Sequence, residues 1–196
     1  TPLNMLGVLS RADSFGEGAL GRRDPIPHAA EHARVLAKQL SETVSDVLPI
    51  SGLMAQTSHT GMLTEELAAA LALLSPLSRL DVVRTFDNDD VHGVLAPQLR
   101  ARLLGLLGEY GVLNGRQIAT RGAAELNSWL TSLSGVDQLR RALGTSTARF
   151  AVLHRAHRIL ARLDQLAFTH PARDHIRTLA VGLRNAPELH LVTVLE

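Results

Sequence analysis

Apolar and polar positions form two different patterns in the first quarter of the chain: short apolar runs and a helical repeat. Short apolar runs at 5–9 and 47–50 have the length of buried strands, and each ends in a polar or small-residue turn. Between them, apolar residues repeat at the spacing of a helix from 28 to 44. A strand, a helix and a strand of these lengths form a βαβ unit with two parallel strands.

From residue 53 onward the apolar positions repeat at helical spacing. The pattern predicts helices at 53–74 with a break near 58–61, 77–86, 97–110, 123–133, 136–143, 145–169 and 173–183. A turn is expected at Asn114-Gly115, an acidic linker at 87–90 and an unfinished element at 187–196. The predicted fold is therefore an α/β part, 1–60, followed by an all-α helical bundle, 61–196. Because two parallel strands make a poor sheet alone, we expect further strands upstream of this chain.

Composition narrows the functional classes. The 196 residues include 45% hydrophobic and 20% charged positions, which excludes a disordered chain. With no cysteine, the chain cannot form disulfides, thiolate metal sites or a cysteine nucleophile. A net charge of +1 and only 3% aromatic residues argue against a nucleic-acid-binding protein. No apolar run approaches the roughly 20 residues of a membrane-spanning helix.

Polar residues follow both predicted strands. Ser10-Arg11-Ala12-Asp13 follows the first strand, and Ser51-Gly52 follows the second. Ligands of open α/β sheets bind at the carboxyl ends of strands, where both loops are expected. The carboxylate of Asp13 could accept the N1–H and N2–H₂ groups of guanine, while the stem and guanidinium of Arg11 cover the ring. For Asp13 alone, an Asx turn or a helix cap is the alternative.

These loops sit in longer stretches, G-V-L-S-R-A-D-S-F-G and V-L-P-I-S-G-L-M-A-Q-T. Together they resemble the last two signatures of bacterial dynamin-like GTPases, in particular the mycobacterial isoniazid-inducible group. The resemblance is best from residue 6 to 74 and thinner to 171. Ser10 stands where the family has Asn or Thr, Arg11 replaces a lysine, and Leu53 replaces the lysine of the last signature.

The resemblance implies the C-terminal βαβ part of a P-loop GTPase domain, with Ser10, Arg11, Asp13, Ser51 and Gly52 binding the base of GTP or GDP. It also implies Mg²⁺, self-assembly and membrane remodelling by a cytoplasmic, peripherally membrane-associated protein. No phosphate loop G-x-x-x-x-G-K-[ST] occurs in the chain. The family places that loop and the Mg²⁺ ligands upstream, so we expect this chain alone to hydrolyse nothing and to hold no catalytic residue.

Two other patterns suggest different sites. His28-Ala29-Ala30-Glu31-His32 matches H-x-x-E-H, in which two histidines one helical turn apart bind Zn²⁺ beside a glutamate base. A solvated first turn of a helix is the simpler interpretation. A second cluster, His154, Arg155, His157 and Arg158, could face an anionic lipid, or could form the solvated face of a bundle helix.

Two alternative functions remain from the helical region. The first is a helical interaction module without a nucleotide role. The second is a helix-turn-helix DNA-binding protein, but its recognition helix from Ala123 would carry Glu125, Asn127 and Trp129 and no basic residue. Trp129 and Tyr110 are predicted to anchor the core with their rings.

Overall fold

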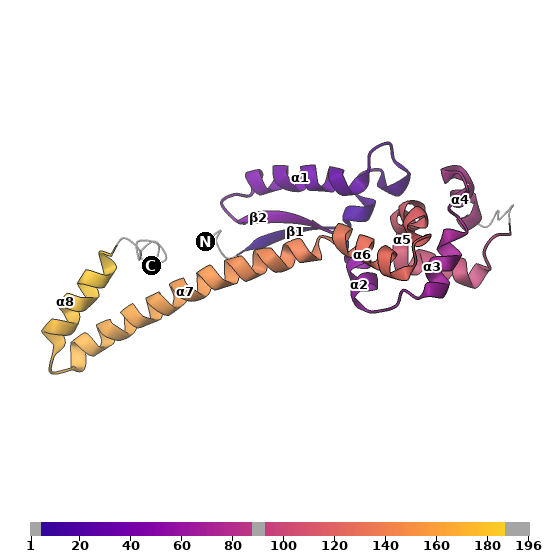
Figure 1. The fold of residues 1–196 in the computed structure, drawn as a ribbon. Helices are drawn as coiled ribbons and strands as arrows, with labels where there is room; N and C mark the ends of the chain where they lie inside the picture. Colours follow the sequence, from indigo (N-terminus) through magenta and orange to yellow (C-terminus); the bar gives the residue numbers. More distant parts are fainter. Residues whose placement is uncertain (1–4, 88–92, 187–196) are drawn as a thin grey trace.

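The computed structural model describes residues 5–87 and 93–186, without the side chains of 146–154. Strands β1 (Leu6–Ser10) and β2 (Asp46–Ile50) form a parallel two-stranded sheet, in register from Leu6 opposite Asp46 to Ser10 opposite Ile50. Helix α1 (Pro25–Gln39) lies on one face of this sheet, and the first part of α7 (Val136–Thr169) runs along the other (Figure 1). The predicted βαβ unit with parallel strands is confirmed.

Helix α1 begins earlier than the apolar pattern indicates. The carboxylate of Asp24 caps it by accepting a 3.0 Å hydrogen bond from the backbone N–H of Ile26, and Pro25 occupies the first turn. The helix ends at Gln39, five residues before the predicted end. The preceding loop contains two 3-10 turns, η2 (Ala12–Ser14) and η3 (Gly18–Leu20).

A helical body follows the second strand. It consists of α2 (Gly52–His59), α3 (Glu65–Ala72), α4 (Arg79–Phe86), α5 (Pro97–Ala119) and α6 (Ala123–Ser134). As predicted, the first long pattern is broken near Gly61. Thr64 caps α3 by accepting from Leu67 N. The core is made of fully buried aliphatic side chains from α2, α3, α5 and α6: Met54, Leu67, Leu71, Leu103, Leu107, Leu126 and Leu130. Tyr110 and Trp129 do lie at this core, with their rings stacked 6.3 Å apart.

The turn predicted at Asn114-Gly115 is wrong, because α5 continues through both residues. Gly115 instead allows close helix packing, since a Cβ there would lie 3.1 Å from Leu126 Cδ1. The bend in α5 occurs at Gly108, where φ is 63°.

The break predicted near Gly144, between helices at 136–143 and 145–169, is wrong as well. The described helix α7 runs through it, and an interior glycine costs a helix only about 1 kcal/mol.

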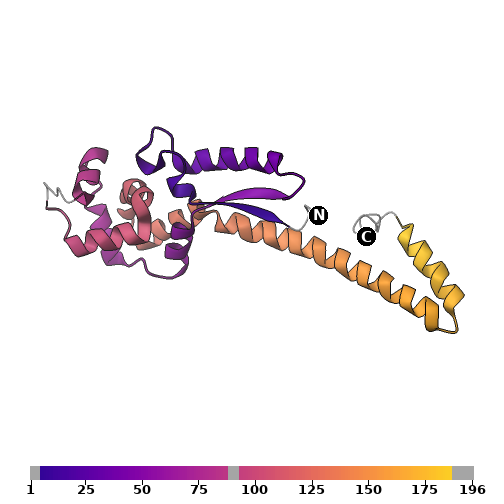
Figure 2. The ribbon, with the colours of Figure 1, turned by 180° about the vertical axis from the view of Figure 1, so that it is seen from behind.

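Helices α7 and α8 (Arg173–Arg184) form an antiparallel pair that extends away from the body (Figures 1 and 2). An ion pair between Arg184 and Asp164 joins them, and Leu160 and Ala167 of α7 are buried. The predicted linker at 88–90, the element at 187–196 and the side chain of His154 lie outside the described residues. Within the described part, no helix combines the length and the apolar character needed to cross a membrane.

Candidate functional site

The two predicted loops lie side by side. The last residues of the strands, Ser10 and Ile50, are partners in the parallel register. Arg11 and Ser51 therefore follow neighbouring strands at the same edge of the sheet, which is the edge where α/β sheets bind ligands.

Arg11 holds an unusual backbone conformation. Its φ of 58° and ψ of 42° make it the one non-glycine residue with positive φ in the described part of the chain. The turn is held by Ser14, whose backbone N–H donates to the Arg11 carbonyl at 3.0 Å, and by the burial of Ala12. The Arg11 side chain is exposed. Such conformations cost about 1–3 kcal/mol for most residues, and they concentrate at functional sites.

Asp13 lies in the 3-10 turn η2 and is half-buried. Its carboxylate makes no hydrogen bond or ion pair with the described residues, so it forms neither the Asx turn nor the helix cap considered as alternatives. The carboxylate points toward the bend in α5, because a Cβ built at Gly108 would lie 3.8 Å from Asp13 Oδ2 and 3.1 Å from Leu53 Cδ2. Asp13 therefore lies close to the helix that begins at the second loop.

The second loop has a buried and an exposed half. Ser51 is fully buried, and its Oγ caps α2 by accepting from Met54 N at 3.3 Å. The neighbouring Gly52 is exposed, and a Cβ there would meet nothing within 4 Å. Because the first N–H groups of a helix have no partner inside it, those of Gly52 and Leu53 are available to an acceptor. Ser51 thus shapes the loop, and Gly52 leaves room for a ligand.

The bend in α5 was not predicted from the sequence. At Gly108 the backbone has φ 63° and ψ 178°, a conformation that is essentially restricted to glycine. Thr57 of α2 donates its hydroxyl to the carbonyl of Leu106, next to the bend. The glycines at 105, 108 and 111 were visible in the sequence, but glycine in a helical pattern does not show which position bends.

The junction of α6 and α7 contacts the second loop directly. The backbone N–H of Ser51 donates to the carbonyl of Ser134 at 3.0 Å. The next residue, Gly135, has φ 79°, and a Cβ there would lie 2.3 Å from the carbonyl oxygen of Pro49. Only glycine fits this position. The N-terminus of α7 is therefore fixed against the end of β2.

The histidines of the H-x-x-E-H pattern pack on an aromatic side chain. The ring of Phe15 lies 5.0 Å from that of His28 and 5.1 Å from that of His32. Among the described residues, no three His, Cys, Asp or Glu side chains gather in a way that could hold a metal ion. The two histidines thus anchor the loop that follows Asp13.

These observations define the class of site: polar loops at the carboxyl ends of parallel strands, with an unpaired carboxylate and free backbone N–H groups. No protein-family model matches the chain, and no solved structure matches it. Two curated proteins are similar to it, namely "Isoniazid-induced protein IniC" from Mycobacterium tuberculosis strains CDC 1551 / Oshkosh and ATCC 25618 / H37Rv. Each is 31% identical over 179 residues, which cover 86% of this chain and 36% of the relative. The chain thus spans about a third of the length of these relatives.

Proposed function

We propose that this chain recognises guanine within a dynamin-like GTPase. The observation that carries the proposal is the unpartnered carboxylate of Asp13 beside the start of α2, at the shared edge of two parallel strands. The similarity to the isoniazid-induced proteins supports the same class.

Each residue of the site has a role in this proposal. Asp13 accepts the N1–H and N2–H₂ groups of guanine, and both bonds are charge-assisted. Arg11 and Ser10 border the base, with the aliphatic stem of Arg11 against the ring. The exposed backbone at Gly52 donates to the guanine oxygen, while Ser51 holds that backbone in place. Adenine presents the opposite donor and acceptor pattern at the same edge, so it is rejected.

The reaction itself needs residues outside these 196. GTP hydrolysis requires a phosphate loop, Mg²⁺ ligands and a positioned water. No G-x-x-x-x-G-K-[ST] occurs in the chain, and the described residues include no set of metal-ligating side chains. We therefore assign the binding of the base to this chain and assign no step of phosphoryl transfer to it.

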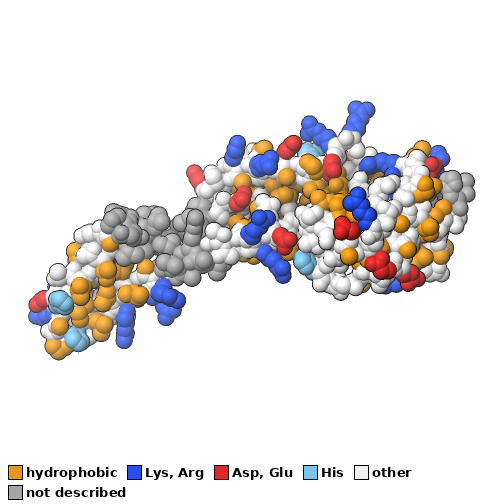
Figure 3. All heavy atoms as spheres, in the orientation of Figure 1, with side chains coloured by type: hydrophobic (Ala, Val, Ile, Leu, Met, Phe, Trp, Pro, Cys, Tyr) orange, Lys and Arg blue, Asp and Glu red, His pale blue; other side chains and the backbone are white. Residues whose placement is uncertain are grey.

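Membrane remodelling is the second part of the proposal. The α7–α8 pair exposes apolar side chains far from the sheet (Figure 3), with Phe168 at 80% exposure. Other exposed apolar residues of the pair include Ile159, Leu179, Val181 and Leu183. Because Ser134 and Gly135 join the base loop to α7, nucleotide binding could move this pair by a hinge. We expect the full-length protein to be cytoplasmic, to self-assemble and to bind membranes peripherally.

The coding sequence upstream of Thr1 gives the first test. An in-frame phosphate loop there supports the GTPase, whereas a start codon next to Thr1 favours a helical interaction module.

The second test measures binding of GDP, ADP and XDP to the protein that contains both this chain and the phosphate loop. Xanthine carries an acceptor in place of the N2–H₂ donor, so Asp13→Asn should lose GDP and gain XDP. Glu31→Gln, on the exposed side of α1, is the control. Equal binding of GDP and ADP by the parent would contradict the proposal.

A membrane test is independent of the nucleotide. The parent should sediment with anionic vesicles, and Phe168→Ser should weaken this binding, whereas Leu80→Ser should not. Leu80 is 59% exposed on α4, so it controls for a general loss of apolar surface. Equal binding by all three proteins would remove the α7–α8 pair as the membrane contact.

A further inference from the structure

A polar pocket lies away from the predicted base site. It has a volume of about 240 Å³ and is formed by the loop before α1, the start of α4 and the middle of α5. Its lining residues include three exposed arginines, Arg22, Arg23 and Arg79, together with Tyr110 and Asn114. The pocket shares no residue with the two loops at the strand ends.

Within the part of the chain that the structure describes, the arginines of this pocket have no acidic partner. Among the described residues, the side chains of Arg22, Arg23 and Arg79 form no ion pair and no hydrogen bond. The carboxylate in the wall, Asp24, is already engaged, because it accepts from Ile26 N at 3.0 Å and from the Tyr110 hydroxyl at 3.1 Å. The carboxylate of Glu17 accepts from the backbone N–H of Arg22.

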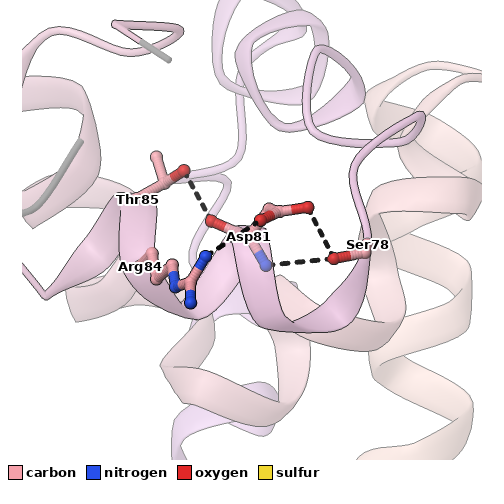
Figure 4. Close-up of polar contacts among 4 residues, drawn as sticks. All are labelled: Ser78, Asp81, Arg84 and Thr85. Atoms are coloured by element: carbon pink, nitrogen blue, oxygen red, sulfur yellow. Dashed lines mark hydrogen bonds and ion pairs between the residues drawn. The ribbon is translucent and has the colours of Figure 1, made fainter. Parts of the chain in front are cut away.

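Arg79 is the first residue of α4. Ser78 caps the helix by accepting from Asp81 N at 3.2 Å, and its hydroxyl donates to the Asp81 carboxylate at 2.6 Å (Figure 4). Arg84 lies 3.8 Å from the same carboxylate. The carboxylate nearest to Arg79 in the sequence is therefore committed within its own helix.

A fourth arginine adds positive charge next to the pocket. Arg116 of α5 donates to the carbonyl of Leu113, and its Nε is buried without a hydrogen-bond partner in the described structure. Burial, and then the neighbouring charge of Arg79, lower the pKa of Arg116. Two guanidinium groups close together without a counter-ion favour the binding of an anion.

We propose that the pocket lined by Arg22, Arg23 and Arg79 binds a phosphate group. Guanidinium groups bind phosphate with paired, charge-assisted hydrogen bonds. The amide of Asn114 already donates one N–H to the Tyr110 carbonyl at 3.1 Å, and its second N–H can add a donor. The volume fits a small anion, since pockets for drug-sized ligands start at about 300 Å³. The phosphate can belong to a soluble phosphate compound or to a lipid headgroup.

The test uses pyrophosphate and vesicles as probes, at constant ionic strength. Calorimetry with pyrophosphate and sedimentation with phosphatidylcholine vesicles, with or without phosphatidic acid, are compared for the parent, Arg79→Gln and Arg23→Gln. Each variant should lose about ten- to a hundredfold in affinity, as expected for one charged hydrogen bond. Arg34→Gln, an exposed arginine on α1 outside the pocket, should bind like the parent. Circular dichroism melting shows whether each variant is folded.

The outcomes separate the sources. Binding of pyrophosphate that is lost in both pocket variants supports a soluble phosphate ligand. Binding of phosphatidic acid vesicles alone, lost in the same variants, supports a lipid headgroup. The proposal is overturned if the parent binds neither probe, or if Arg34→Gln loses as much as Arg79→Gln. It is also overturned if polyglutamate binds these arginines and phosphate does not. None of these results depends on guanine recognition by Asp13.

Discussion

The backbone N–H of Ser51 donates to the carbonyl of Ser134, so the loop after β2 is joined to the last residue of α6. Helix α7 begins two residues later, at Val136. This one hydrogen bond places the N-terminus of α7 against the predicted base site. A shift of the loop therefore acts on α7 directly rather than through the packed core.

The first prediction concerns Gly135. Its φ of 79° and the 2.3 Å approach of a Cβ to the Pro49 oxygen mean that Gly135→Ala must move the junction. We expect it to lower the free energy of unfolding by about 2 kcal/mol or more, measured by urea denaturation. Gly144→Ala is the matched control, because Gly144 lies in α7 with nothing within 4 Å of its Cβ. The control should be neutral or stabilise by up to about 1 kcal/mol. Equal effects of the two substitutions would contradict this account.

The sequence predicted the sheet and the loops because their signals are local. Two short apolar runs separated by a helical pattern determine a parallel pair, and that pair brings Asp13 near the loop at Ser51. The interactions of each loop residue are not local. Ser51 was predicted to line a base, but its hydroxyl and its N–H are used in capping and in the bond to Ser134. Guanine binding itself stays a prediction, as does the domain boundary near residue 60.

The glycines show where sequence reasoning fails. Gly115 was interpreted as a turn, although it lies within α5 where Leu126 packs close. Gly108 and Gly135 have the special backbone conformations, and nothing local distinguishes them from Gly115. A glycine indicates freedom of φ or lack of a side chain, and only the packing of distant elements decides which is used.

The second prediction separates a ligand-binding carboxylate from a structural one. Asp13 has no partner in the described structure, so Asp13→Asn should change the free energy of unfolding by less than about 0.5 kcal/mol. Asp24→Ala removes the cap of α1 and the acceptor of Tyr110, and should cost about 2 kcal/mol. Chemical denaturation of both variants measures the difference. A large loss in Asp13→Asn would indicate a structural role for that carboxylate.

The third prediction concerns the bend in α5. Gly108→Ala places a methyl group 3.1 Å from Leu53 Cδ2 at a φ of 63°, so it should destabilise the protein by about 1–3 kcal/mol. Gly105→Ala, in the same helix with open space around its Cβ, should be neutral or stabilising. Thermal unfolding of both variants tests this. If Gly108→Ala were as stable as Gly105→Ala, the bend would not be a fixed feature of α5.

The last prediction is a pH dependence at Tyr110. Burial, followed by the charge of Asp24 and its hydrogen bond, raises the pKa of Tyr110 above its ordinary value of 10.0, although Arg79 opposes this. The folded protein therefore holds the phenol proton more tightly than the unfolded chain. This contribution to stability is fully present below the unfolded pKa of about 10 and is lost as the pH rises through the folded value. Stability should thus fall more steeply above about pH 10 in the parent than in Tyr110→Phe.

A direct measurement is possible because the chain contains a single tyrosine. Phenolate absorbance in the near ultraviolet follows Tyr110 alone, and the titration midpoint of the folded protein should lie above that of the protein unfolded in urea. Asp24→Asn removes the negative charge but keeps an oxygen acceptor, so it should lower the midpoint in the folded state without reaching the unfolded value. The remaining difference would then contain burial and the retained hydrogen bond, less the opposing charge of Arg79. If the folded and unfolded midpoints coincided, Tyr110 would be solvated and its bond to Asp24 would not hold the loop before α1 against α5.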